Sequence, residues 1–183
     1  MNNNQLIDLV LEEIRTSVSG ISEADIKCLL DALDMEKRIF CDGAGRSRLQ
    51  IEGFAMRLTQ MGFQSVVVGE ATTPAITKDD ILLICSGSGE TPMLIEHAVK
   101  AKRKGSRVLA VTATKDSALY RLGDISLLIE SSSKARYSKL SIQPMGSLFE
   151  QSVGILCDIM VLLLMNKYQV SNEEMYQNHS NLE

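Results

Sequence analysis

The sequence is poor in several residue types, and each shortage argues against a class of protein. Its 183 residues contain no tryptophan, two histidines and only 4% aromatic side chains. The 23 acidic residues outnumber the 19 basic ones, so a net charge of −4 provides no basic surface for nucleic acid. Histidine, cysteine and acidic residues form no cluster at metal-ligand spacing. We therefore expect neither a nucleic acid partner nor a bound metal.

Cysteine is also scarce, and its spacing argues against a disulfide framework. The four cysteines include no Cys-x-x-Cys pair, and three of them lie within apolar runs. Such residues usually behave as small buried hydrophobes in a reducing compartment. We therefore expect free thiols in the protein interior at Cys28, Cys41, Cys85 and Cys157.

Long hydrophobic runs are missing as well. The run Val153–Met165 contains Asp158 and is too short to span a bilayer, so it predicts a core helix. Residues Met1–Asn4 show no basic segment that leads into an apolar one, so we expect no secretory signal. The 45% hydrophobic and 23% charged residues are typical of a soluble globular protein. We therefore expect a cytoplasmic location, no membrane partner and a single domain over residues 1–183.

The sequence does contain a regular alternation of short apolar runs with helical patterns. Helices are predicted over 5–34 and 144–178, on either side of an alternating core over 37–130. Strands separated by helices indicate an α/β fold, a three-layer αβα sandwich with a five-stranded parallel sheet. The serine-rich segment Glu130–Ser141 is predicted to be a mobile loop. The predicted strands are Arg38–Cys41, Ser65–Val68, Ile81–Cys85, Arg107–Val111 and Asp124–Ile129.

The turn Ser86–Thr91 joins a predicted buried strand to a helical pattern that begins at Pro92. Thr91 suits the N-cap, and Pro92 suits the first helical position. A helix start offers free N–H groups and partial positive charge, while serine adds donors and glycine allows close approach. The turn therefore predicts a phosphate site without a basic side chain. The alternative is an ordinary strand-to-helix turn rich in small residues. The expected binding residues are Ser86, Gly87, Ser88, Gly89, Glu90 and Thr91.

A second turn, Gly43–Ser47, also follows a predicted strand. A dinucleotide site would need glycine where Arg48 stands, and Ser86–Thr91 lacks the lysine of a nucleoside triphosphate loop. We therefore expect no nucleotide cofactor. Because parallel strands place both turns at one edge of the sheet, Ser47 could offer its hydroxyl to the same ligand. The alternative for the two glycines of this turn is simple turn geometry.

Glu150 is the candidate general base. It lies within the first two turns of a helix that we expect to open at Pro144. Removal of a proton next to a carbonyl needs a carboxylate held close to carbon and partly shielded from water. Leu148 and Phe149 could supply that shielding. The alternative is a surface acid that is favoured by its place at a helix start.

The two histidines carry weaker signals. His97 lies in the middle of a predicted helix and is expected to be structural or solvated. His179 lies in the tail, where a lone histidine is usually disordered.

Five segments, in matching order over nearly the whole chain, resemble the 6-phospho-3-hexuloisomerase family of the sugar isomerase (SIS) superfamily. Ser86–Thr91 alone would indicate only the superfamily, whereas Gln143–Gln151 is much more specific. The resemblance implies a flavodoxin-like SIS fold, a homotetramer built as a dimer of dimers, and no metal or redox cofactor. The five segments are Gly43–Ser47, Phe54–Leu58, Ser86–Thr91, Ser141–Gln151 and His179–Glu183.

The family interconverts D-arabino-3-hexulose 6-phosphate and D-fructose 6-phosphate, the second step of formaldehyde fixation by the ribulose monophosphate pathway. By position, the resemblance implies that Ser47 and Ser86–Thr91 bind the phosphorylated ketose. It also implies that Glu150 is the proton acceptor in an enediol mechanism. We further expect His179 to assist catalysis, by polarising oxygens or helping to open the sugar ring, from a neighbouring subunit.

The chain departs from the family pattern near the expected site. Arg48 stands where the family usually has glycine, and Gln60 where it often has histidine. Either departure could alter the substrate preference. One alternative is therefore another isomerase of the superfamily, of the arabinose 5-phosphate type. The other is a non-catalytic protein that binds a sugar phosphate, which would not need Glu150.

Overall fold

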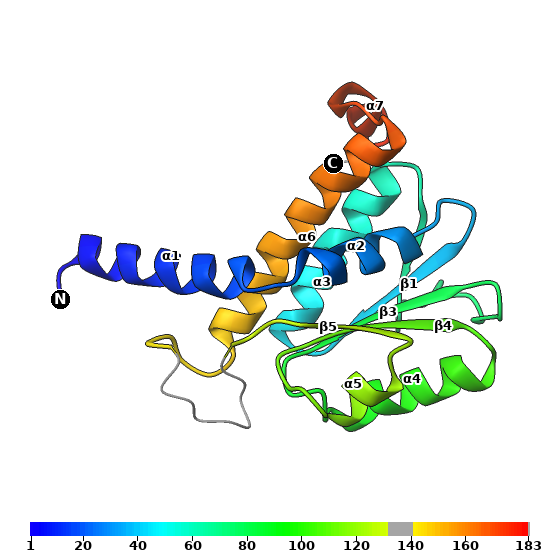
Figure 1. Cartoon of the computed structure of the whole chain (residues 1–183). Helices are drawn as coiled ribbons and strands as arrows, with labels where there is room; N and C mark the ends of the chain where they lie inside the picture. The colour runs from blue at the N-terminus through cyan, green and yellow to red at the C-terminus, as the bar shows by residue number, and fades with distance from the viewer. Residues whose placement is uncertain (132–140, 183) are drawn as a thin grey trace.

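The computed structural model describes residues 1–131 and 141–182. A five-stranded parallel sheet, in the order β2-β1-β3-β4-β5, lies between two layers of helices (Figure 1). This confirms the predicted fold class, and each strand lies within two residues of its predicted bounds. The strands are β1 (Arg38–Gly43), β2 (Gln64–Val67), β3 (Ile81–Ser86), β4 (Arg107–Thr112) and β5 (Ile125–Leu128).

Helices precede, connect and follow the strands, as the sequence pattern predicts. Two of them precede the sheet, three connect its strands, and two follow the last strand. They are α1 (Asn3–Ser19), α2 (Glu23–Ala32), α3 (Arg46–Gln60), α4 (Pro92–Arg103), α5 (Ala118–Leu122), α6 (Ser147–Tyr168) and α7 (Asn172–Gln177).

The sheet is buried on both faces, because its side chains alternate between two apolar cores. From β3, Ile81, Leu83 and Cys85 point into the core shared with α2, α3 and α6. Leu82 and Ile84 point into the core shared with α4 and α5. A strand buried on both faces has a continuous apolar sequence, so β3 could be predicted from its run of apolar residues.

α6 is the central helix of one layer, as the apolar run within it predicted. Within the described residues, it is the one helix long and apolar enough to cross a membrane by length and composition. The mean hydropathy of the window concerned is 1.9, and 56% of that window is buried within the protein. Burial of this extent is what a core helix requires.

The start of α6 differs from the prediction. The helix begins at Ser147, with Gly146 at the N-cap, and Pro144 lies in the turn before it. The Ser147 N–H donates to the Pro144 carbonyl at 3.2 Å, and Met145 between them has a φ of 60°. This left-handed residue separates the proline from the helix. The mobile loop predicted at Glu130–Ser141 falls mainly on residues 132–140, outside the described part of the chain.

The cysteines follow the prediction except at one position. Cys41, Cys85 and Cys157 are buried free thiols, whereas Cys28 is exposed, so the prediction of an interior position was wrong there. Cys28 lies on the outer side of the short helix α2, whose buried residues are Leu29 and Ala32. Burial raises the pKa of Cys41 to about 12, so this thiol stays protonated and unreactive at neutral pH.

The order of the strands determines where a ligand can bind. The chain first adds β2 on one side of β1 and then places β3 on the other. Such a switch point opens a crevice beyond the carboxyl ends of the two central strands. Gly43 at the end of β1 is paired with Cys85 of β3, so the turns that follow are neighbours.

Candidate active site

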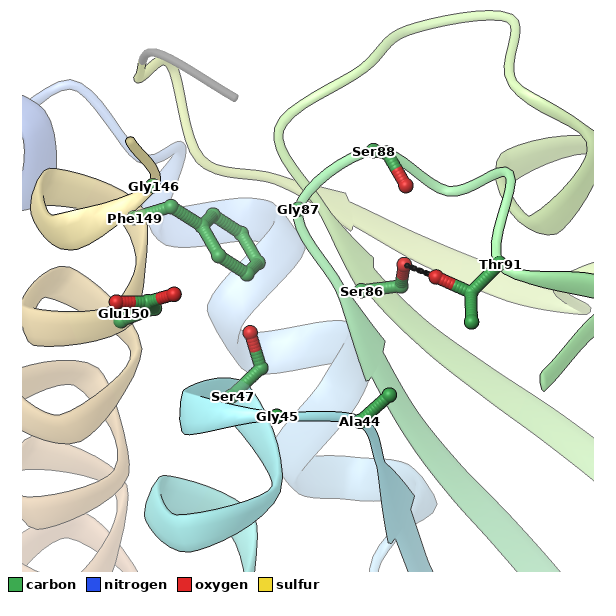
Figure 2. A pocket seen from close by; sticks show the side chains of 10 residues that line it. All are labelled: Ala44, Gly45, Ser47, Ser86, Gly87, Ser88, Thr91, Gly146, Phe149 and Glu150. Atoms are coloured by element: carbon green, nitrogen blue, oxygen red, sulfur yellow. Dashed lines mark hydrogen bonds between the residues drawn. The ribbon is translucent and has the colours of Figure 1, made fainter. Parts of the chain in front are cut away.

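The crevice beyond β1 and β3 holds a cavity of about 280 Å³. Figure 2 shows the turn after β1, the turn after β3 and the first turn of α6 facing one another around it. Hydroxyl groups come from the two strand turns, and a carboxylate comes from α6. The lining residues are Ala44, Gly45, Ser47, Ser86, Gly87, Ser88, Thr91, Gly146, Phe149 and Glu150.

Glu150 faces this cavity although it is almost entirely out of contact with solvent. The residue is only 3% exposed. Its Oε2 atom accepts a hydrogen bond from Nε of Arg46 at 2.6 Å, and the Arg46 side chain is 61% exposed. Of the two residues expected to shield it, Phe149 lines the same cavity, whereas Leu148 is buried beside a separate pocket at α1. A buried carboxylate thus lies at the cavity wall with one charged partner at its outer side.

Arg46 is the residue of this site that sequence reasoning missed. It is the first residue of α3, directly after Gly45 in the β1–α3 turn. Its partner Glu150 lies 104 positions later, so no local spacing pattern could reveal the pair. Gly45 has φ 58° and ψ −138°, a region that favours glycine, and this conformation directs the chain from β1 into α3.

The β3–α4 turn is held together by its own hydroxyl groups. Ser86 Oγ lies 3.3 Å from Thr91 Oγ1 (Figure 2). It also accepts the Gly89 N–H at 3.2 Å. Thr91 is the N-cap of α4, as predicted, but its side chain makes no capping hydrogen bond. The start of α4 therefore keeps its unsatisfied N–H groups beside a row of hydroxyls. This is the arrangement in which a phosphate group is stabilised.

Gly87 of the same turn packs closely against α6. A Cβ atom at this position would lie 3.0 Å from Cδ1 of Phe149. A larger residue here would require Phe149 to shift by a few tenths of an ångström, so glycine favours the close approach of this turn to the first turn of α6. The close approach brings the hydroxyl-lined turn and Glu150 to one cavity.

Two of the predicted binding residues, Gly89 and Glu90, are not among those that line the cavity. Glu90 Oε1 accepts the Ala118 N–H at 2.8 Å and so caps α5. A Cβ atom on Gly89, whose φ is 64°, would lie 2.0 Å from Ser117 Oγ. The structure therefore shows Gly89 and Glu90 joining the turn to α5. Their predicted contact with substrate stays a prediction, whereas Ser47, Ser86, Gly87, Ser88 and Thr91 do line the cavity.

Arg48 does not enter the cavity. Its Nε atom donates to Glu52 at 2.5 Å, its Nη1 to the Val68 carbonyl at 3.0 Å and its Nη2 to Glu70 at 3.1 Å. These bonds direct the guanidinium toward the end of β2. The departure from the family pattern at this position therefore leaves the ligand space open.

The two histidines lie outside the set of residues that line the cavity. His97 Nδ1 is 2.8 Å from Oδ2 of Asp42, a residue only 1% exposed, so the expected structural role fits. His179 is exposed, stacks on Tyr176 and lines a separate pocket with Gln60, Val161 and Met165. The 22-residue α6 spans about 33 Å, and Glu150 lies in its first turn. Figure 1 shows α7 and the C-terminus at the far end of α6, so one chain does not bring the two predicted catalytic residues together.

A cation site is not evident in the described part of the chain. Within residues 1–131 and 141–182, no group of three or more His, Cys, Asp or Glu residues could hold a metal ion.

The model of the SIS domain matches residues 32–153, which include β1, β3 and the start of α6. The chain belongs to the SIS family. This SIS protein is 39% identical to the 3-hexulose-6-phosphate isomerase of Bacillus subtilis, and the alignment covers 100% of both chains. It is 35% identical to the 3-hexulose-6-phosphate isomerase of Mycobacterium gastri, over 97% of this chain and 89% of that protein.

Solved structures resemble this SIS protein over its full length. A Methanococcus jannaschii protein, inferred from its crystal structure to be a 3-hexulose-6-phosphate isomerase, has a TM-score of 0.85 at 31% identity. That match covers 98% of this chain and 99% of the other. A sugar-phosphate isomerase candidate from Listeria monocytogenes has a TM-score of 0.78 at 19% identity, over 98% of both chains, and this likeness shows the fold alone.

Proposed function

We propose that this SIS protein interconverts D-arabino-3-hexulose 6-phosphate and D-fructose 6-phosphate through an enediol. The observation that carries the proposal is the buried Glu150, which faces a hydroxyl-lined helix start across one cavity. The family membership and the 3-hexulose-6-phosphate isomerases among the relatives support it. This reaction is the second step of formaldehyde fixation by the ribulose monophosphate pathway.

The phosphate group of the substrate is bound at the β3–α4 turn. Ser86, Ser88 and Thr91 supply hydroxyl donors, and the start of α4 supplies N–H groups and the positive end of the helix dipole. Ser86 and Thr91 bond to each other in the free protein, so their hydroxyls can turn toward the phosphate without a change of backbone. Ser47 lies across the cavity and contacts the sugar. This anchoring fixes the reactive carbons relative to Glu150, which supplies much of the rate enhancement.

Glu150 transfers one proton between two neighbouring carbons. Starting from the 3-ketose, its carboxylate removes the proton from C2, and the electron pair forms the C2–C3 double bond of the enediol. The C3 carbonyl oxygen takes up the negative charge and then accepts the proton of the O2 hydroxyl. The C2 carbonyl forms as the electron pair of the C2–C3 double bond takes a proton at C3. Glu150 returns this proton, which completes fructose 6-phosphate. General base catalysis of this kind contributes about 10²–10⁴-fold, and the step needs neither a metal nor a redox cofactor.

Arg46 orients the carboxylate for this transfer. Its Nε–H holds Oε2 of Glu150, which leaves Oε1 to take the proton. The guanidinium also keeps a positive charge beside the cavity while negative charge develops on the substrate oxygen. Arg46 is therefore part of the proposed catalytic group.

The proposal includes a homotetramer, built as a dimer of dimers, in the cytoplasm. Apolar side chains remain exposed on the outer faces of α1 and α6, at 41–65% of their full exposure, and they can be buried between copies. We propose that His179 of one copy acts at the cavity of another, because within one chain His179 lines a different pocket, beside Val161 and Met165 of α6. The exposed residues are Leu6, Ile7, Leu9, Leu11, Ile155, Leu162 and Leu163.

The test is product analysis with a panel of sugar phosphates. Fructose 6-phosphate in heavy water should lose the NMR signal of its C3 hydrogen while the 3-ketose appears. Arabinose 5-phosphate and ribulose 5-phosphate should remain unchanged. Conversion of the pentose phosphates alone would favour the arabinose 5-phosphate type of isomerase. Binding of fructose 6-phosphate without any exchange or product would favour a sugar-phosphate sensor.

A further inference from the structure

α1 makes an unusual set of contacts for a helix at the edge of the molecule. Of its 17 residues, the one that is buried is Ser17, a polar residue. Ser17 Oγ donates a hydrogen bond to the Glu130 carbonyl at 2.9 Å, just after β5. Glu13 lies one helical turn earlier, on the same face of α1. Figure 1 shows this part of α1 passing beside the first turns of α6.

Glu13 binds the chain on its way into α6 with both carboxylate oxygens. Oε2 accepts from Ser141 Oγ at 2.7 Å and from Gln143 Nε2 at 3.0 Å, and Oε1 accepts from the Ile142 N–H at 2.7 Å. One carboxylate thus collects three donors from a segment about 130 positions later. Ser17 and Glu13 together hold the two sides of the connection between β5 and α6.

The segment that Glu13 holds has few other contacts. Ile142 is 52% exposed and Met145 is 64% exposed, so apolar burial contributes little to its position. Gly146 follows immediately, lines the cavity and caps α6 without a side chain. Glu150 comes one turn later, and its N–H donates to the Gly146 carbonyl at 3.0 Å. The hydrogen bonds from Glu13 therefore lie a few residues from the cavity wall.

We propose that Glu13 is a positioning residue for the reaction, which it serves by fixing the turn Ser141–Gly146. This proposal rests on the proposed function, because it concerns the geometry of the same cavity. Glu13 touches neither substrate nor the reacting atoms. Its carboxylate determines where Gly146 and the first turn of α6 lie, and hence where the Glu150 carboxylate meets the substrate carbons. A displacement of about 1 Å at such a site can lower the rate by about 10²-fold.

The test compares Glu13→Ala with Glu12→Ala, a matched carboxylate removal on the same helix. Glu12 is exposed, and among the described residues its polar partners are Arg15 and Thr16 of its own helix. For Glu13→Ala we expect kcat with fructose 6-phosphate to fall at least about tenfold, which is about 1.4 kcal/mol. We expect KM to change little, because the β3–α4 turn that anchors the phosphate is untouched. Glu13→Gln keeps one acceptor oxygen and should restore part of kcat, and Glu12→Ala should behave as wild type.

Amide hydrogen exchange provides a second readout that does not depend on activity. Glu13→Ala should speed exchange across residues 141–150, whereas Glu12→Ala should not. If Glu13→Ala fails to fold, Gln143→Ala removes one of the three donors from the other side and should give a smaller change of the same kind. A folded Glu13→Ala variant with kcat within twofold of Glu12→Ala, or with unchanged exchange at 141–150, would overturn the proposal. Absence of isomerase activity in the wild type would instead refute the proposed function. The hydrogen-exchange comparison would then still test whether Glu13 fixes residues 141–150.

Discussion

At the scale of single residues, the proposed chemistry depends on how little water reaches Glu150. A carboxylate that is 3% exposed must be paired, because an isolated buried charge is unstable. Arg46 meets that need from the solvent side, with 61% of its side chain exposed, and so leaves the cavity side free. The sequence predicted Glu150 and its apolar neighbours Leu148 and Phe149. It could not predict Arg46 as the partner, because only the fold brings these two elements together.

A residue-scale prediction concerns the phosphate. Ser88→Ala removes a hydroxyl that lines the cavity, and a hydrogen bond to a charged group contributes about 1.5–3 kcal/mol. We expect KM for fructose 6-phosphate to rise at least about tenfold, with kcat nearly unchanged. The measurement is steady-state kinetics, with Ser22→Ala at the start of α2 as the control. An equal loss of affinity for a sugar without phosphate would contradict the assignment of Ser88.

At the scale of elements, the positions of the strands could be predicted from the sequence. The central strand β3 is buried at every residue and reads as a continuous apolar run. The edge strand β2 has no fully buried residue, yet its bounds lie within one residue of the prediction. The predicted start of α6 was wrong because proline is common at a first helical position. The left-handed conformation of Met145, which ends that possibility, has no signal in the local sequence. Glu13 also escaped notice, because its three donors lie in a segment about 130 positions away.

The contacts of Glu13 give a pH dependence at this scale. Burial opposes ionisation, but hydrogen bonds from Ser141, Ile142 and Gln143 outweigh it and lower the pKa of Glu13 from 4.5. A lowered pKa in the folded state contributes stability that is present above pH 4.5 and is lost as the pH falls through the folded-state value. We expect wild type to lose more stability in this range than Glu13→Gln. Urea unfolding at pH steps from 6 to 3 measures the difference, and identical profiles for the two proteins would contradict it.

At the scale of the whole molecule, the proposed role of His179 requires a second copy of the chain. His179 lines a pocket beside Val161 and Met165, which come 11 and 15 residues after Glu150 in α6, about 17–23 Å along the helix axis. The exposed apolar faces of α1 and α6 provide surfaces through which a second copy can close that gap. The sequence alone could suggest a shared site only through the family resemblance. The fold adds a physical reason for a shared site, because within one chain His179 lies away from the cavity that Glu150 lines.

Mixing two inactive variants tests the shared site. Glu150→Gln lacks the base, and His179→Ala lacks the tail histidine, so each should be inactive by itself. Mixed oligomers should regain activity, because one cavity then combines an intact Glu150 with an intact His179 from the other copy. Co-expression followed by a fructose 6-phosphate assay provides the measurement. Mixed oligomers that form, as shown by mass spectrometry, yet remain as inactive as their parents would contradict the shared site.

The most direct test of the central claim follows a single proton in the variant Glu150→Gln. The amide keeps the size of the side chain but cannot accept a proton from carbon. We expect the variant to bind fructose 6-phosphate with near wild-type affinity by calorimetry, while exchange of the C3 hydrogen with heavy water falls to the uncatalysed rate. Exchange that continues near the wild-type rate would show that another group removes the proton, and the account of this cavity would be wrong.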